Sequence, residues 1–193
     1  SPVGVAVDDN GLVWVTNSGG SGSVSLWDPG TGKAYTGSPF SGGGLDAPHG
    51  VAIDSNNNAW IANKSANVVS EFANSGVVSA SGYSGGGING ESFIAVDSGD
   101  NKWVVNHTGN SITELAPNGS ALSPSTGFYG GSATPILNSP VGIGVDLDGD
   151  VWVTNSGNNT ITEFLGAGSP LVTPIVGNLL ASYGYGASAV NKP

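Results

Sequence analysis

Five polar residues depart from the repeat that the rest of the chain follows, and their types suit acid–base or metal chemistry. They are His49, Lys64, Glu91, Ser92 and His107. Histidine titrates near neutral pH and binds metals, and a nearby carboxylate can serve as its acid or base partner. His49, Glu91 and His107 are therefore candidate catalytic residues, and all five are candidate ligand-binding residues. Sequence drift at surface positions is the competing explanation.

Motifs that would support catalysis do not accompany these residues. The chain has no cysteine, which excludes thiolate catalysis, disulfide bonds and cysteine zinc sites. It also has no Gly-Lys-Ser/Thr loop or His-Glu-x-x-His run. We therefore expect no cofactor, with a divalent cation at the histidines as the alternative. The sequence leaves enzymatic activity open but favours a non-catalytic role.

A second candidate metal site is the acidic turn that contains Asp146, Asp148 and Asp150. This turn resembles the opening of a calcium loop. A complete loop needs a bidentate glutamate at its twelfth position, where this chain has Gly157. An ordinary hairpin turn is the simpler interpretation.

Composition restricts the partners and the location. The net charge is −10 and Lys plus Arg number only 4, so the chain lacks the cations that neutralise nucleic-acid phosphates. No apolar run is long enough to span a membrane. Charged residues are 9% of the chain, and there are 33 glycines. This low charge favours a secreted, periplasmic or cell-surface protein, with a protein or a glycan as its partner.

A tryptophan segment occurs four times and organises the chain. The copies are Val13–Asn17, Ala59–Asn63, Lys102–Asn106 and Val151–Asn155. Each tryptophan follows an aspartate at a constant spacing, in the pairs Asp8 and Trp14, Asp54 and Trp60, Asp97 and Trp103, and Asp146 and Trp152. Repetition at roughly 45 residues is typical of β-propellers.

Each repeat predicts an inner strand, an aspartate turn, the tryptophan strand, a third strand and a looser outer segment. The whole chain, 1–193, then forms one domain with blades near residues 2–47, 48–90, 91–139 and 140–193. The third strands carry Glu71, Glu114 and Glu163, where the first repeat has Leu26. We expect these glutamates on the more solvated face of the strand.

The residues that recur in every repeat have structural and functional interpretations. The repeat aspartates are expected to accept backbone hydrogen bonds in their turns, with a ring of carboxylates as the alternative. The tryptophans should pack between blades, although sugar stacking would also use them. The asparagines that end the tryptophan segments should cap a turn. The outer aromatics either fill the blade ends or line a carbohydrate groove; they are Phe40, Tyr83, Phe128 and Tyr129.

The combined pattern Pro-x-Gly-(Val/Ile)-(Ala/Gly)-(Val/Ile)-Asp followed by Val-Trp-Val-Thr-Asn resembles NHL-type repeats and the repeats of streptogramin-lyase-like propellers. This resemblance covers the whole chain and implies an all-β propeller of four four-stranded blades. The blades would form a closed four-bladed ring, part of a larger propeller or half of a pair of copies; an unclosed solenoid is a further alternative. Streptogramin-lyase-like enzymes would use His and Glu at a channel mouth with a divalent cation, but no residue here can be matched to theirs.

Propeller topology places the loop into each inner strand and the loop after each tryptophan strand on the same face. The five deviating residues should therefore surround the channel mouth, with the aspartate turns on the opposite face. We expect a non-catalytic binding or assembly module outside the cytoplasm. One alternative is a lyase- or hydrolase-like enzyme that uses His49, Glu91 and His107 with a metal. The other is a self-associating structural protein that forms a homo-oligomer or polymer.

Overall fold

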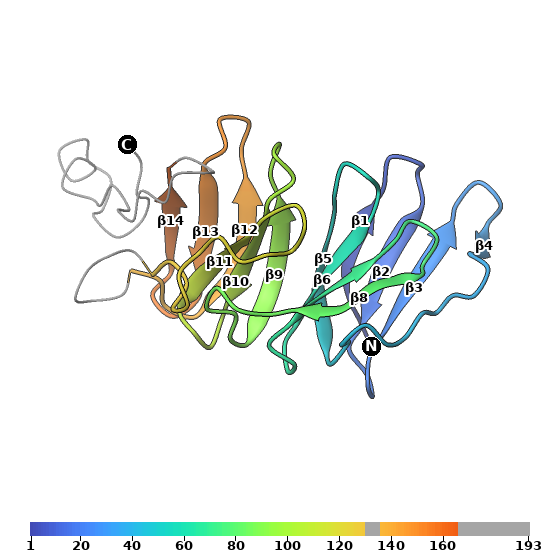
Figure 1. Ribbon diagram of the computed structural model, residues 1–193, viewed down its shortest axis with the longest axis horizontal. Coiled ribbons are helices and arrows are strands. Elements are labelled where there is room, and N and C mark those ends of the chain that lie inside the picture. Colours follow the sequence, from blue (N-terminus) through green and yellow to red (C-terminus); the bar gives the residue numbers. More distant parts are fainter. Residues whose placement is uncertain (130–135, 166–193) are drawn as a thin grey trace.

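The computed structural model describes residues 1–129 and 136–165, and every regular element in them is a strand. The strands form four antiparallel sheets, which we call blades 1 to 4 (Figure 1). Blade 1 contains β1 (Pro2–Val7), β2 (Val13–Asn17), β3 (Ser23–Asp28) and β4 (Lys33–Ala34), and blade 2 contains β5 (Pro48–Ile53), β6 (Ala59–Asn63), β7 (Val69–Phe72) and β8 (Val78–Tyr83). Blade 3 contains β9 (Glu91–Val96), β10 (Lys102–Asn106) and β11 (Ser111–Leu115), and blade 4 contains β12 (Pro140–Val145), β13 (Val151–Asn155) and β14 (Thr160–Phe164).

The all-β prediction is confirmed, but the predicted fourth strand varies between blades. Blades 1 and 2 have it as β4 and β8. In blade 3 the described part of the outer segment forms only isolated bridges, between Leu115 and Ala121 and between Ile112 and Phe128. The outer segment expected near Tyr183 in blade 4 lies outside the described residues. No helix in the described ranges could cross a membrane.

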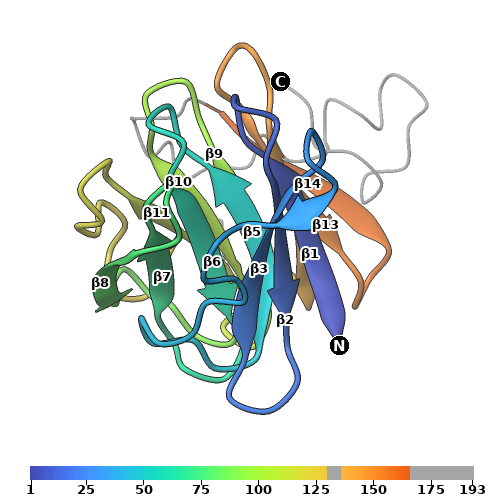
Figure 2. The same cartoon turned by 90° about the vertical axis from the view of Figure 1, so that its right-hand side faces the viewer.

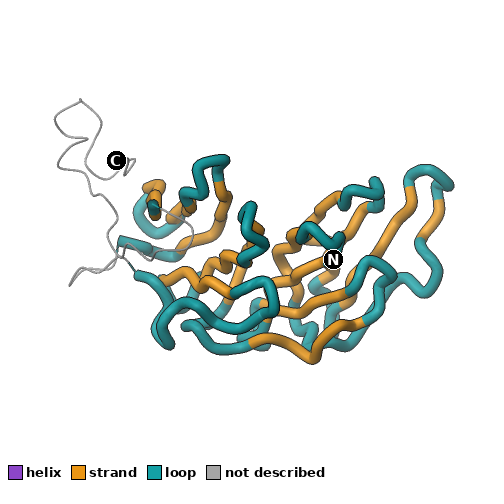
Figure 3. Tube along the Cα trace, turned by 45° about the horizontal axis from the view of Figure 1, so that its top comes forward, coloured by secondary structure: helices purple, strands orange, loops and turns teal. Residues whose placement is uncertain are grey.

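The inner strands β1, β5, β9 and β12 pack side by side in chain order. Glycine permits this close approach, since a Cβ at Gly50 would lie 2.7 Å from the Cα of Phe93 in the next blade. The sheets follow one another along an open arc, with blades 1 and 4 at its two ends (Figures 1 and 3).

The described residues therefore do not form the closed four-bladed ring that was one of our expectations. The physical reason lies in the contacts between blades. The cluster between blades 1 and 2 runs from Val51 in the inner strand to Phe72 in the third strand. Because the two blades pack along this whole width, the angle between them is small. Four blades at such angles do not complete a turn.

The tryptophan strands β6 and β10 are buried on both faces because each lies between two neighbouring blades. In β6, Ala59 and Ile61 pack in the cluster that contains Trp14, whereas Trp60 and Ala62 pack in the cluster that contains Val104. The predicted packing of the tryptophans between blades is confirmed for Trp14, Trp60 and Trp103, which are all buried.

An aspartate–tryptophan hydrogen bond fixes every hairpin. The indole nitrogens of Trp14, Trp60, Trp103 and Trp152 donate to Asp8, Asp54, Asp97 and Asp146 at 3.1, 2.9, 2.9 and 2.9 Å. The other oxygen of each carboxylate accepts two backbone amides of its own turn. The predicted role of these aspartates in their turns is confirmed, and the indole bond is an additional function.

The asparagines that end the tryptophan strands join separate segments instead of only capping a turn. The Asn106 Oδ1 atom accepts the Asn89 amide from the loop before the inner strand. Its Nδ2 atom donates to Ser111 and Thr113 in the third strand. Asn63 and Asn155 make equivalent contacts in blades 2 and 4.

We predict that Asp97→Ala lowers the free energy of unfolding by about 3 kcal/mol, because the buried Trp103 indole and two turn amides lose their acceptor. Urea denaturation would measure the loss. Asp146→Ala removes the equivalent indole and turn-amide bonds at an exposed turn, where water can replace them, and should cost less. Equal losses in the two variants would contradict this account.

Candidate functional site

The five residues singled out by the sequence lie at one end of the sheets. The pairing of Pro48 with Asn63 places His49 and Lys64 together at that end of blade 2. The pairing of Asn106 with Glu91 places Glu91, Ser92 and His107 at the same end of blade 3. We call this the loop end. The aspartate turns lie at the other end of the same strands, which we call the turn end.

His49 is half-buried and lies against the neighbouring blade. Its ring meets the Phe93 ring edge-to-face, with centroids 6.1 Å apart. The Nδ1 atom is buried and has no hydrogen-bond partner among the described residues. Burial and, secondarily, the charge of Lys64 lower the pKa of His49, which favours the neutral imidazole.

Glu91 is fully buried and joins blade 3 to blade 2. Its Oε1 atom accepts the backbone amide of Asn63 at 3.2 Å. Its Oε2 atom is buried without a hydrogen-bond partner in the described part of the chain. Burial raises the pKa of Glu91 to about 7, so this side chain can hold a proton near neutral pH.

The remaining predicted residues are less available for acid–base chemistry. His107 Nδ1 lies 3.1 Å from the carbonyl oxygen of Pro140, so this ring nitrogen donates to blade 4. Ser92 is buried, whereas Lys64 is exposed. The structure thus brings the five residues to one end, but Glu91 and His107 bind neighbouring blades. Their role in ligand binding or catalysis stays a prediction.

Neither candidate metal site has a cluster of ligands. Within residues 1–129 and 136–165, no group of three or more His, Asp or Glu side chains is arranged to hold a metal ion. Asp146 of the acidic turn accepts the amides of Asp148 and Asp150 and the Trp152 indole. These contacts are those of a hairpin turn, which agrees with the simpler interpretation of the sequence.

Two shallow clefts differ in chemical character. The loop-end cleft has a volume of about 500 Å³ and is lined mainly by neutral polar and glycine residues, including Asn67, Asn89, Ser111, Ser125 and Thr126. The turn-end cleft has a volume of about 330 Å³ and is lined by four aspartates, Asp9, Asp54, Asp97 and Asp100. A neutral hydrogen-bonding ligand therefore matches the loop end better than the turn end.

The outer aromatics mostly fill the blades. Phe40 packs on the core between blades 1 and 2, and Phe128 is buried beside Trp103. Tyr83 stacks on Trp60 with ring centroids 5.0 Å apart. Only Tyr129 of the four is largely exposed. A carbohydrate groove made of all four aromatics is therefore not present.

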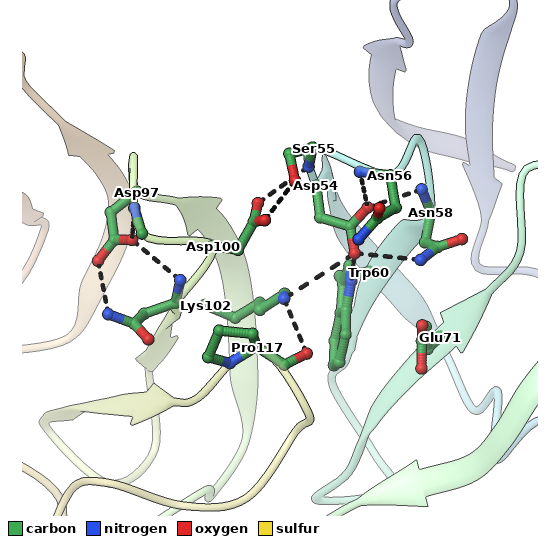
Figure 4. Close-up of polar contacts among 12 residues, drawn as sticks. Asp54, Ser55, Asn56, Asn58, Trp60, Glu71, Asp97, Asp100, Lys102 and Pro117 are labelled. Carbon is green, nitrogen blue, oxygen red and sulfur yellow. Dashed lines mark hydrogen bonds and ion pairs between the residues drawn. The ribbon is translucent and has the colours of Figure 1, made fainter.

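Sequence reasoning missed a buried lysine between blades 2 and 3. The Lys102 Nζ atom lies 3.9 Å from Asp54 Oδ2, 4.1 Å from the centroid of the Trp60 ring and 3.2 Å from the Pro117 carbonyl oxygen (Figure 4). Burial lowers the pKa of Lys102, while nearby carboxylates, Asp54 first, oppose that change. The signal in the sequence was a charged residue where the other repeats have Val13, Ala59 and Val151.

The third-strand glutamates were placed on the wrong face. Glu114 and Glu163 are buried, and Glu71 is half-buried and accepts the Tyr83 hydroxyl at 2.6 Å. For Glu71 and Glu114 the reason is that β7 and β11 lie between neighbouring blades, so both faces of these strands are largely covered. Burial, with a smaller contribution from Asp97, raises the pKa of Glu114 to about 7.

For the buried lysine, we predict that Lys102→Ala lowers the free energy of unfolding by about 2 kcal/mol, because Asp54 and the Trp60 ring lose their cation. Lys102→Met should cost less, since its side chain retains the packing on Trp60 without burying a charge. Chemical denaturation of both variants would measure this difference. A methionine variant as unstable as the alanine variant would contradict the expectation.

For the buried glutamates, we predict that stability falls as pH rises from about 5 to about 8. Glu91 and Glu114 have pKa values near 7 in the folded chain against an ordinary value of 4.5. Their contribution is therefore complete below pH 4.5 and is lost as pH rises through 7. The double variant Glu91→Gln/Glu114→Gln should show a flatter thermal midpoint over this range. An equally steep profile would contradict the assignment.

Comparisons with known proteins support the architecture. The family model described as NHL repeat matches residues 137–164. No curated protein matches the chain significantly. Among solved structures, an inactive variant of virginiamycin B lyase from Staphylococcus aureus with quinupristin has a TM-score of 0.67 and 20% identity, over 88% of this chain and 53% of that chain.

Two further structures show the same likeness. Hydrazine synthase from Kuenenia stuttgartiensis has a TM-score of 0.66 and 14% identity, over 84% of this chain and 45% of that chain. A gluconolactonase from Xanthomonas campestris has a TM-score of 0.58 and 16% identity, over 80% of this chain and 54% of that chain. This chain spans about half the length of these three structures. At such identities the likeness shows the fold alone.

The antiparallel blades, the repeated tryptophan strands and these matches lead to the same conclusion. The predicted resemblance is confirmed: the chain carries an NHL repeat at residues 137–164 and has the fold of streptogramin-lyase-like propellers.

Proposed function

We propose that this chain is a non-catalytic binding module that acts outside the cytoplasm and presents its loop end to a protein or a glycan. The observation that carries the proposal is the neutral lining of the loop-end cleft. Its amide and hydroxyl groups can both donate and accept hydrogen bonds. They match sugar hydroxyls or exposed peptide groups better than they match a charged ligand.

The contacts of the predicted acid–base residues also support a binding role. Glu91 accepts a backbone amide of blade 2, and His107 donates to a carbonyl of blade 4. Both side chains therefore help to hold neighbouring blades together. A general acid or base must instead reach a proton on the substrate. Only 9% of the residues are charged, and this low fraction is the basis for placing the module outside the cytoplasm.

An enzyme is the second candidate, because neighbours in fold include a virginiamycin B lyase and a gluconolactonase. In this alternative, His49, Glu91 and His107 would act with a divalent metal at the loop end. One specific observation favours the enzyme: the Nδ1 atom of His49 has no hydrogen-bond partner among the described residues. Such an atom can bind a metal or accept a proton from a ligand.

We predict that Asn89→Ala/Thr126→Ala weakens glycan or protein binding by about tenfold, since each exposed polar group lost from the cleft removes a hydrogen bond. A glycan array and a pull-down with the wild-type chain would first identify the ligand, and titration would then compare the variants. Asn74→Ala, an exposed asparagine outside the cleft, is the control. Unchanged affinity in the cleft variant would move the binding site elsewhere.

Turnover assays separate the two candidates. The wild-type chain would be incubated with quinupristin and with a sugar lactone, with and without Mg²⁺. The binding proposal expects no turnover. Turnover that disappears in His49→Ala/His107→Ala would establish the enzyme instead.

A further inference from the structure

Glu91 stands at a repeat position where the other three repeats have proline. Those residues are Pro2, Pro48 and Pro140. Strand β9, which begins at Glu91, lies beside β5 and β6 of blade 2 (Figure 2). The Glu91 side chain is fully buried at this junction, and its Oε2 atom has no hydrogen-bond partner among the described residues. An ionised carboxylate is therefore costly here, whereas the neutral acid is tolerated.

The carboxyl group of Glu91 faces the loop of blade 2 that joins β6 to β7, residues 64–68. Its Oε1 atom accepts the amide of Asn63, which directly precedes this loop, at 3.2 Å. The amide of Val68, at the end of the loop, also acts on the carboxyl group and lowers its pKa. The Nδ2 atom of Asn63 donates to the Val68 carbonyl at 2.9 Å and so joins the two ends of the loop. Glu91 thus interacts with both ends.

The same loop forms one wall of the loop-end cleft. Asn67 lines the cleft, and its Oδ1 atom accepts the amide of Gly90 at 2.8 Å. Gly90 is the residue before Glu91, and Asn89, which precedes it, also lines the cleft. Two lining residues are therefore positioned by the backbone that the buried carboxyl group of Glu91 anchors.

We propose that Glu91 is a positioning residue for the loop-end cleft: its neutral side chain holds loop 64–68 in place, and its ionisation releases Asn67 and weakens ligand binding. The physical reason is the buried Oε2 atom. A charge on this carboxyl group favours a conformation in which water reaches it. Loop 64–68, whose residues are all exposed or half-buried, is the segment that can move to admit water. This regulation rests on the proposed binding function of the cleft.

The pKa of Glu91 gives the direction of the change. Burial raises this pKa to about 7 from an ordinary value of 4.5, while nearby backbone amides oppose the rise. The support of the loop is therefore complete below pH 4.5 and is lost as pH rises through 7. The titratable and charged groups at the loop end of the surrounding elements are Asp46, His49, Lys64 and His107. Burial has a larger effect on the pKa of Glu91 than any of them.

Amide NMR tests the support of the loop without a ligand. In the wild-type chain the Gly90 amide should titrate with a midpoint near pH 7, and Glu91→Gln should remove this titration. Ser139 is the internal control, because it donates to Asn110 in the same way but precedes Pro140. Its pH response should be equal in the two proteins. A Gly90 amide that does not titrate, or that titrates equally in Glu91→Gln, would overturn the proposal.

Affinity at about pH 5 and about pH 8 tests the effect on the cleft. The probe is the neutral oligosaccharide bound most tightly on the glycan array or, where none binds, the protein captured in the pull-down. It should bind the wild-type chain about fivefold more weakly at the higher pH. Glu91→Gln should bind it equally at both, with the wild-type affinity of the lower pH. Because this variant keeps both histidines, a pH effect that comes from them would persist in it.

Glu114→Gln is the matched control for a general loss of stability. It removes another buried carboxyl group whose pKa is about 7, but this one lies outside the cleft. It should keep the wild-type pH dependence of binding. A Glu91→Gln variant that keeps the dependence, or a Glu114→Gln variant that loses it, would overturn the proposal. If Asn89→Ala/Thr126→Ala binds the probe as well as the wild type does, the proposed function fails, and the Gly90 titration alone decides whether Glu91 holds the loop.

Discussion

The hydrogen bond between each aspartate and the indole of its tryptophan is the contact on which the other features of a blade depend. It joins a turn residue to a strand residue through a carboxylate whose other oxygen already holds the turn amides. The turn thereby fixes the orientation of the ring, and the ring forms the surface on which the next blade packs. A residue pair within one hairpin thus determines how two blades meet. This explains why both members recur in all four repeats.

The contact between blades is adjusted by two positions that face the same interface. One is the third-strand residue opposite the tryptophan, and the other is the first residue of the next tryptophan strand. Along the chain these are Leu26 with Ala59, Glu71 with Lys102, and Glu114 with Val151. The first pair is apolar, the second combines opposite charges, and the third buries a carboxylate against an apolar residue. The same architecture therefore accepts different chemistry at each interface, provided that a buried carboxylate finds a cation or keeps a proton.

The strands were predictable from the sequence because their signals are local: alternating apolar residues, Asp-rich turns and a constant aspartate–tryptophan spacing. Whether the blades close into a ring was not predictable from the sequence. The angle between neighbouring blades depends on the packing of many side chains, and no local pattern determines it. The face of Glu114 was mistaken because alternation identifies two faces but not which one is solvated when both meet neighbours. Topology correctly placed His49 and Glu91 at one end, but their partners come from other repeats, which no local pattern reveals.

Departures from the repeat have two different meanings in this chain. Lys102 and His107 break the repeat pattern, and the structure explains both as contacts between blades. His49 and Glu91 also contact neighbouring blades, but each keeps one buried polar atom that no described residue satisfies. A bound ligand gains most where the free chain leaves such an atom unpaired, because that desolvation cost is already present. Departure from a repeat is therefore a weak sign of function by itself, and an unsatisfied buried atom at the same position is the stronger one.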